Sequence, residues 1–193
     1  MHTVASHWLQ TALMLPLSGL AAAAILAHQQ PDLSSVKAVL PPKEPALQNL
    51  PSMLVQTSIK QSVPLELSEG EINDYLARKL TSEQKGMSGR FAKLERLLLD
   101  FEEGNCRMHL CWEVLGHHMV GTVELTLTRT ANDFEIEVKQ GAYGRLKVPR
   151  ALLPPLLPAL QELARVCHPE IDALFKLPHI RLAKDKLVLN PKF

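Results

Sequence analysis

Histidine and cysteine, the residue types that most often carry out chemistry, are present in this chain but not at catalytic or metal-ligand spacings. The chain has eight histidines and three cysteines, but it contains no GxSxG, HExxH, P-loop or GxGxxG pattern and no metal-type CxxC pair. Those patterns place a nucleophile, zinc ligands or phosphate-binding amides. The sequence therefore predicts no enzymatic activity, no catalytic residue, no metal and no cofactor.

The histidines and cysteines are interpreted as structural residues. His117 and His118 are adjacent and have no carboxylate near them in the sequence, so a solvated turn is expected there. His109 lies among polar residues of a predicted strand and could meet Glu124 across a hairpin. The number of cysteines is odd, so not all of them can pair, and we expect small buried apolar side chains.

Four cations lie around a predicted junction between a strand and a helical stretch. They are Lys139, Arg145, Lys147 and Arg150, and Gly141 and Gly144 beside them allow close approach of the backbone. These cations could bind anionic lipid headgroups at the entrance of a groove. The alternative is a solvated basic edge that prevents the strand from pairing with another chain.

Leucine supplies 35 of the 193 residues, against nine aromatic residues, so the core must be aliphatic. Five leucines at helical spacing and one tryptophan on a predicted strand are candidates for the wall of a hydrophobic groove: Leu152, Leu153, Leu156, Leu157, Leu160 and Trp112. An aliphatic wall suits acyl chains. The same leucines could equally close an ordinary core between a helix and a sheet.

Residues 1–28 are predicted to form a signal anchor that crosses a membrane as a single transmembrane helix. Residues 8–27 contain no charged side chain, and about 20 apolar residues suffice to span a bilayer. A cleaved signal peptide is the alternative. Because short N-terminal anchors usually carry their domain across the membrane, we expect a single-pass protein of the bacterial inner membrane with an extracytoplasmic, periplasmic domain.

Residues 29–61 are predicted to form an extended linker, and residues 62–193 the folded domain. Five prolines in the linker disfavour helix and sheet hydrogen bonds: Pro31, Pro41, Pro42, Pro45 and Pro51. Part of this stretch, residues 47–55, could instead dock on the domain.

The domain is predicted to belong to the α+β class. Residues 63–67 alternate as a short strand and lead into a helix that begins with a capping box, in which Ser68 and Glu71 bond each other's backbone. Residues 81–90 are polar and are expected to form a loop. Four segments with a two-residue apolar period, at residues 97–101, 106–114, 122–128 and 134–139, then predict an antiparallel meander with one apolar face.

The C-terminal third is predicted to be helical and then to close as a strand pair. Three prolines at residues 154, 155 and 158 predict an irregular opening, followed by a helix over residues 155–167 and a short second helix over residues 170–175. Residues 180–182 and 187–189 are expected to pair around a turn at residues 184–186.

Three short segments carry a family resemblance. They are Ser68-Glu69-Gly70-Glu71-Ile72-Asn73 with Tyr75-Leu76, residues 153–160, and the closing Leu187-Val188-Leu189. With the order of the elements, they resemble small extracytoplasmic bacterial proteins related to the lipid-binding TULIP (SMP/BPI-like) group, such as the YceB-like lipoproteins and the YpmS-like membrane-anchored proteins. The resemblance implies a curved meander sheet wrapped along a long leucine-rich helix, with an aliphatic groove for acyl chains between them. The chain lacks the lipidated cysteine of the YceB-like lipoproteins.

Charge and composition limit the classes of function. The 21 Lys and Arg nearly balance the 20 Asp and Glu, for a net charge of +1, which argues against a nucleic-acid partner. The resulting hypothesis is a membrane-anchored extracytoplasmic protein that binds a lipid or another hydrophobic ligand. The alternative is a non-catalytic structural or accessory subunit of a membrane protein complex, with a partner protein docked on the exposed face of the sheet.

Overall fold

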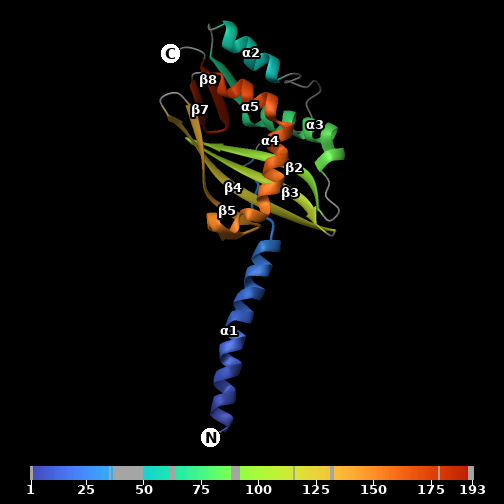
Figure 1. Ribbon diagram of the computed structural model, residues 1–193, viewed down its shortest axis with the longest axis vertical. Helices are drawn as coiled ribbons and strands as arrows, with labels where there is room; N and C mark the ends of the chain where they lie inside the picture. The colour runs from blue at the N-terminus through green and yellow to red at the C-terminus, as the bar shows by residue number, and fades with distance from the viewer. Residues whose placement is uncertain are drawn as a thin grey trace.

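Two antiparallel sheets and five α-helices make up the part of the chain that the structure describes (Figure 1). The computed structural model describes residues 2–34, 36, 50–60, 64–87, 92–114, 116–130, 133–177 and 179–190. The helices are α1 (His2–His28), α2 (Leu50–Lys60), α3 (Glu69–Met87), α4 (Leu157–Val166) and α5 (His168–Phe175), with the 3-10 turns η1 (Arg150–Leu152) and η2 (Pro154–Leu156). The strands are β1 (Leu65–Ser68), β2 (Ala92–Glu102), β3 (Asn105–Val114), β4 (His117–Thr130), β5 (Asp133–Tyr143), β6 (Leu146–Val148), β7 (His179–Ala183) and β8 (Lys186–Asn190). The predicted α+β class is confirmed.

The larger sheet is an antiparallel meander of five strands in the order β2-β3-β4-β5-β6. All four predicted strands are present in it as β2 to β5. The side that the two-residue period predicts to be apolar is buried, since Leu97, Leu110 and Val123 are 3% exposed or less. Arg107 and Thr122 lie at alternate positions on the same strands and therefore face the other side. The meander and its apolar face are confirmed.

The smaller sheet has three strands in the order β1-β8-β7. The predicted pairing of β7 with β8 is confirmed, and β1 adds itself to the other edge of β8. Two backbone hydrogen bonds fasten this sheet to the larger one: Gly104 N–H donates to Leu182 O (3.1 Å), and Asp185 N–H donates to Phe101 O (3.1 Å). Because β1 pairs with β8, the first and last strands of the domain lie side by side.

Helix α3 begins where the sequence predicts and ends later. Ser68 N–H donates to Glu71 Oε2 (2.9 Å) and Glu71 N–H donates to Ser68 Oγ (3.3 Å), which confirms the capping box. The loop predicted for residues 81–90 is wrong as far as residue 87, because the helix continues to Met87. This stretch contains Glu, Gln and Lys, whose high helix propensity outweighs the cost of its single glycine. Residues 88–90 lie outside the described part of the chain.

Side chains of α3 fasten it along β2, an edge strand of the meander. Asn73 Nδ2 donates to Leu99 O (2.8 Å), and Asn73 Oδ1 accepts from Leu99 N–H (2.7 Å). One turn earlier, Glu69 Oε2 accepts from Phe101 N–H (2.8 Å). Alternate residues of an edge strand direct their backbone groups away from the sheet. Helix α3 therefore supplies the hydrogen bonds that a further strand would supply.

Helix α2 corrects the prediction of a fully extended linker. Residues 50–60 form this helix, and its only proline, Pro51, is in the first turn, where no intrahelical hydrogen bond is lost. Leu50 and Leu54 are buried, and α2 packs beside α5 at the end of the molecule far from α1 (Figure 1). Docking of part of this stretch was the alternative considered from the sequence. Residues 37–49 lie outside the described part of the chain.

The C-terminal helices follow the predicted pattern but are shorter than the long helix expected. The prolines give two successive 3-10 turns, η1 and η2, before α4 begins at Leu157. Helix α4 has ten residues and α5 has eight, and a turn at Cys167 separates them. The irregular opening and the second helix are therefore confirmed. The helix predicted over residues 155–167 is present as α4, over Leu157–Val166. At ten residues it is shorter than the long helix that the resemblance implies, because the prolines before it hold the chain in 3-10 turns.

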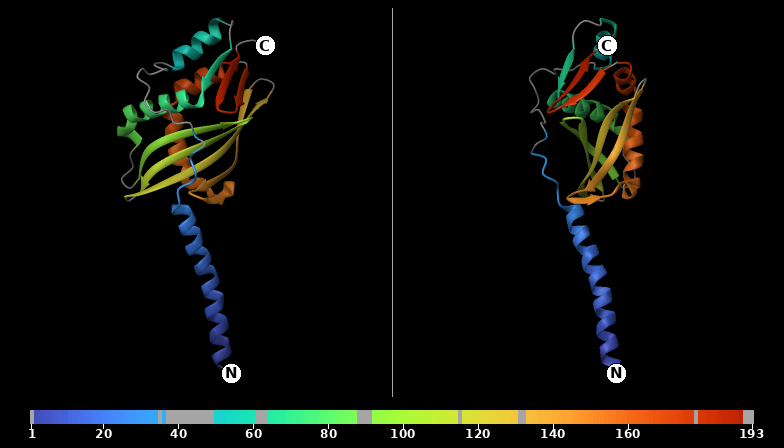
Figure 2. Two further views of the ribbon diagram at one scale, coloured as in Figure 1. Left: turned by 180° about the vertical axis from the view of Figure 1, so that it is seen from behind. Right: turned by 90° about the vertical axis from the view of Figure 1, so that its left-hand side faces the viewer.

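Helix α1 extends away from both sheets and contacts the larger one at its C-terminal end (Figures 1 and 2). Its described apolar side chains lie in solvent, with Met14 and Leu20 each 68% exposed. Arg145 N–H, in the turn between β5 and β6, donates to Leu26 O (2.9 Å). The helix predicted over residues 8–27 is thus present. Among the side chains that the structure describes, no helix combines the length and the apolar character needed to cross a membrane.

Candidate ligand-binding cavity

An apolar cavity of about 320 Å³ lies between the larger sheet and the helices that cover its apolar face. The sheet contributes Leu97, Leu99, Phe101, Cys106, Met108, Leu125, Thr126, Leu127 and Ile136. The helices contribute Ile72 and Leu76 of α3, Leu160, Leu163 and Ala164 of α4, Ile171 and Leu174 of α5, and Leu50 and Leu54 of α2. The smaller sheet adds Leu67, Leu182 and Leu187, while Glu170 and Cys167 complete the wall. The volume lies at the lower end of the roughly 300–1,000 Å³ typical of ligand pockets.

The predicted groove leucines do not share one surface. Leu160 lines the cavity. Leu153 and Leu156 are buried instead in a separate apolar cluster with Val123 and Val148, at the end of the sheet near α1. The prediction of a continuous leucine stripe is wrong here, because the two 3-10 turns interrupt the 3.6-residue period on which the stripe depends.

The remaining groove candidates also lie outside the cavity wall. Leu152 is 57% exposed and Leu157 is 50% exposed. Trp112 is half-buried and packs against both apolar clusters, with its ring 3.1 Å from the place that a Cβ at Gly121 would occupy. It therefore fills space between the clusters as a core residue.

Glu170 is the charged residue of the cavity wall, and it is held by α3. Tyr75 Oη and Lys79 Nζ both donate to Glu170 Oε1, which joins α5 to α3. Burial raises the pKa of Glu170, but the bonds from Lys79 and Tyr75 outweigh it, and the net pKa lies below the usual value. Burial and the same hydrogen bond raise the pKa of Tyr75. Glu170 is therefore ionised and paired near neutral pH, which is a structural arrangement rather than that of a proton donor.

The three cysteines are free thiols, as predicted. Cys106 and Cys167 line the cavity, whereas Cys111 lies on the opposite face of the sheet and lines a separate hollow with Gln30 and His118. Burial raises the pKa of all three thiols, to about 12 for Cys106. A raised pKa keeps a thiol protonated, so none is activated as a nucleophile.

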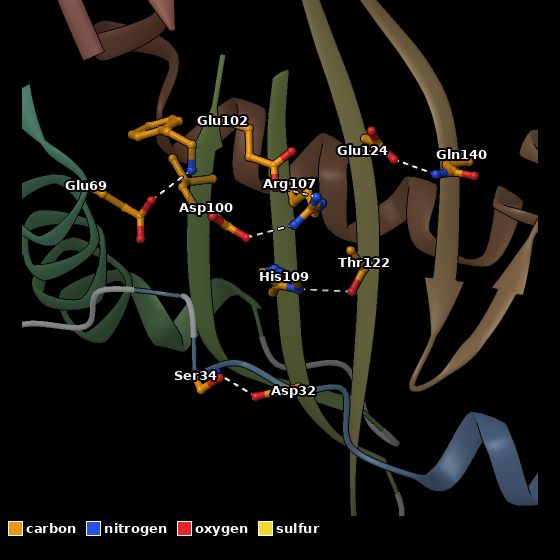
Figure 3. A network of polar contacts seen from close by, with 12 residues as sticks. Asp32, Ser34, Glu69, Asp100, Glu102, Arg107, His109, Thr122, Glu124 and Gln140 are labelled. Carbon is orange, nitrogen blue, oxygen red and sulfur yellow. Dashed lines mark hydrogen bonds and ion pairs between the residues drawn. The ribbon is translucent and has the colours of Figure 1, made fainter. Parts of the chain in front are cut away.

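The histidines take positions that differ from the prediction. His117 and His118 begin β4 rather than occupying a turn, and His118 Nδ1 lies 2.9 Å from Glu95 Oε2 on β2, a residue distant in sequence. His109 Nδ1 bonds Thr122 Oγ1 (3.0 Å) and not Glu124, because the register of β3 and β4 sets His109 opposite Thr122 (Figure 3). Burial lowers the pKa of His109, against an opposing effect of Asp100. No group of three metal-ligating side chains exists in the described part of the chain.

The polar face of the sheet carries an ion-pair network. Arg107 Nη1 lies 3.2 Å from Asp100 Oδ2, and Arg107 Nη2 lies 2.5 Å from Glu102 Oε1 (Figure 3). The chain that follows α1, through Asp32 and Ser34, runs on this side of the sheet, while α4 lies on the other (Figures 2 and 3). The network therefore belongs to the face opposite the cavity.

The four predicted headgroup-binding cations do not form one cluster. Lys139 Nζ donates to Asn105 Oδ1 (3.3 Å), at the start of β3. Arg145 instead holds the end of α1: its N–H donates to Leu26 O, and its Nε donates to Gln30 O (3.2 Å). The other two cations, Lys147 and Arg150, are exposed on β6 and η1 close to Arg145 in the chain.

Fold and cavity define a class of protein: an α+β domain with a partly open apolar cavity between sheet and helices and an exposed N-terminal helix. No protein-family model matches the chain, and comparisons with curated proteins and with solved structures find no match. Membership of the TULIP group therefore remains a prediction from sequence. An aliphatic groove between sheet and helix was predicted, but of the six predicted wall residues only Leu160 lines the cavity, because the walls come from eleven elements across both sheets and four helices.

Proposed function

We propose that this chain is a membrane-anchored, extracytoplasmic, non-catalytic protein that binds a lipid-like ligand with a single slender apolar chain. The observation that carries the proposal is the apolar cavity of about 320 Å³ between sheet and helices. Its wall is almost wholly aliphatic, with Phe101 as its one aromatic side chain among the lining residues that the structure describes. Aliphatic walls favour a flexible acyl chain over a flat aromatic ligand, which gains from ring contacts.

The proposed anchor is α1. The helix has 27 residues, which gives a length of about 40 Å at 1.5 Å per residue, against a hydrocarbon thickness of about 30 Å. Residues 8–27 have no charged side chain, and the described ones from Met14 to Leu26 face solvent rather than the domain. The side chains of residues 2–13 and 15 lie outside the described part, so the proposal rests on their sequence. A bacterial inner membrane with the domain in the periplasm is the proposed location.

The resemblance to TULIP-like proteins also supports a lipid ligand. In that group a curved sheet wraps a helix and holds acyl chains between them, and here the cavity occupies the corresponding space between the meander and α4. On the strength of that resemblance, we also propose that the larger sheet is curved and that Arg145, Lys147 and Arg150 bind lipid headgroups.

Two cysteines allow a direct test with a built-in control. The full chain is stripped of bound lipid and kept in non-ionic micelles, then treated with N-ethylmaleimide with and without 1-dodecanol, and labelled peptides are quantified by mass spectrometry. Cys167 lines the cavity and Cys111 does not, yet both are half-buried thiols. Dodecanol is expected to slow labelling of Cys167 at least about tenfold and to leave Cys111 unchanged. If dodecanol slows labelling of Cys167 no more than that of Cys111, and solvent extracts of the chain as first purified contain no lipid, the ligand is rejected and a structural subunit is favoured.

A further inference from the structure

The end of the domain beside α1 carries an exposed group of cationic and apolar side chains, here called the basal patch. It consists of Arg145, Lys147, Arg150, Leu152 and Leu157. All five are exposed, and the two leucines retain 57% and 50% of their surface in solvent. They lie on the β5–β6 turn, β6, η1 and the first residue of α4, which gather at the base of the domain next to the C-terminal end of α1 (Figures 1 and 2).

Helix α1 and the base of the domain are in close contact. Arg145 N–H donates to Leu26 O (2.9 Å) and Arg145 Nε donates to Gln30 O (3.2 Å). Gly144 packs so closely that a Cβ there would overlap the carbonyl oxygens of Ala27 and Gln29. The uncharged stretch of α1 ends at Ala27. The β5–β6 turn therefore lies where the proposed anchor leaves the hydrocarbon.

The charged and apolar side chains of the base are complementary to the surface of an anionic bilayer. From residue 141 to residue 161 the chain contains three cations, all in the basal patch, and no Asp or Glu. Exposed leucines beside cations are the pattern of segments that insert apolar side chains at the headgroup boundary while their charges stay among the phosphates. Leu152 and Leu157 fit that pattern, because other leucines of the same stretch, Leu153 and Leu156, are buried.

We propose that the basal patch seats the domain on the surface of the membrane that α1 crosses, with Leu152 and Leu157 at the headgroup boundary and the cations against anionic phospholipids. The inference rests on the proposed anchor and adds a second, lateral contact with the bilayer. The occupant is a lipid surface rather than a protein, because the patch is continuous with the end of α1 and carries net positive charge.

The test adds one tryptophan at a time to the full chain, reconstituted in vesicles that contain doxyl-labelled lipid, and subtracts the signal of the parent chain, which contains Trp8 and Trp112. Leu152→Trp places the probe in the patch, and Val55→Trp is the matched control, an exposed apolar position (41%) on α2 at the far end of the domain. In vesicles with anionic lipid, doxyl quenching of the added fluorescence is expected to be at least about threefold stronger for Leu152→Trp. Adding Lys147→Glu and Arg150→Glu is expected to reduce the quenching of Leu152→Trp to the level of the control.

The outcomes separate this inference from the anchor on which it rests. If the full chain fails to float with vesicles after alkaline extraction, the proposed anchor is wrong, and the proposed contact between the basal patch and the membrane is wrong with it. If the chain floats but Leu152→Trp is quenched no more than Val55→Trp, the anchor stands and the seating is overturned. Quenching that is unchanged by the paired charge reversals, or equal in neutral vesicles, overturns recognition of anionic lipid. Circular dichroism of each variant excludes unfolding as the cause.

Discussion

Replacing Asn73 with alanine should loosen the helix that forms one wall of the cavity. Asn73 is 2% exposed and makes two hydrogen bonds to Leu99, at 2.8 and 2.7 Å. Each bond contributes about 0.5–1.5 kcal/mol net, and a backbone group left unpaired in a buried place costs about 1–3 kcal/mol. We therefore expect Asn73→Ala to lower the free energy of unfolding by about 2–4 kcal/mol, a large share of the roughly 5–15 kcal/mol of an ordinary domain.

The assay is urea unfolding of the full chain in non-ionic micelles, followed by tryptophan fluorescence, with Gln140→Ala as the control. Gln140 Nε2 donates to Glu124 Oε2 (2.6 Å) on the exposed face, so its loss should cost under about 0.5 kcal/mol. Hydrogen exchange of the β2 peptide should also accelerate at the Leu99 amide in Asn73→Ala. A loss equal to that of Gln140→Ala, with an unchanged Leu99 amide, would refute the view that side chains of α3 replace a neighbouring strand.

Two further variants address the cavity and the pH dependence of stability. Ala164→Phe adds a ring at a cavity-lining position of α4 and should weaken dodecanol protection of Cys167 by about tenfold, or ~1.4 kcal/mol. The control is Ala159→Phe, on the same helix but outside the cavity wall, which should leave that protection unchanged. If both variants weaken the protection equally, the ligand binds elsewhere. Burial depresses the pKa of His109 below its unfolded value of about 6.5. As the pH falls below about 6.5, the unfolded chain binds a proton at this histidine before the folded chain does, so the free energy of unfolding decreases until the folded pKa is passed. Urea titrations at pH 7 and 5 should therefore show a smaller loss of stability in His109→Gln than in the native chain. An equal loss in the two proteins would disprove this role of His109.

Local patterns in the sequence predicted the strands because each depends on few neighbours. The alternation that marks β2 to β5 and the Ser68–Glu71 capping box act within one element or one turn, and both are confirmed. The prediction failed at α2, where proline density indicated an extended chain. Pro51 sits in the first helical turn, and burial of Leu50 and Leu54 on the domain supplies stability that local propensity does not.

The cavity was less accessible to prediction than the strands. A leucine stripe predicts an apolar surface, but it does not predict whether that surface packs against a sheet, is exposed to solvent or lines a cavity. Leu156 and Leu160 are the same residue type and are only one helical turn apart in the sequence. Leu156 nevertheless packs against Gly121, whereas Leu160 lines the cavity. Leu156 lies in a 3-10 turn and Leu160 in α4, so the helical period does not relate their positions. The Glu170–Lys79 pair similarly joins two helices that are far apart in the chain.

The covalent path from α1 to the sheets has a mechanical consequence. The chain passes through α2, at the far end of the domain, before it reaches β1 (Figure 1). If the contact between α1 and Gly144 separates, a pulling force on α1 is transmitted along the chain to α2 before it reaches β1. Helix α2 is held by buried Leu50 and Leu54, whereas β1 is held by a ladder of four register pairs with β8. Pulling on α1 would thus peel away a wall of the cavity before it unravels either sheet.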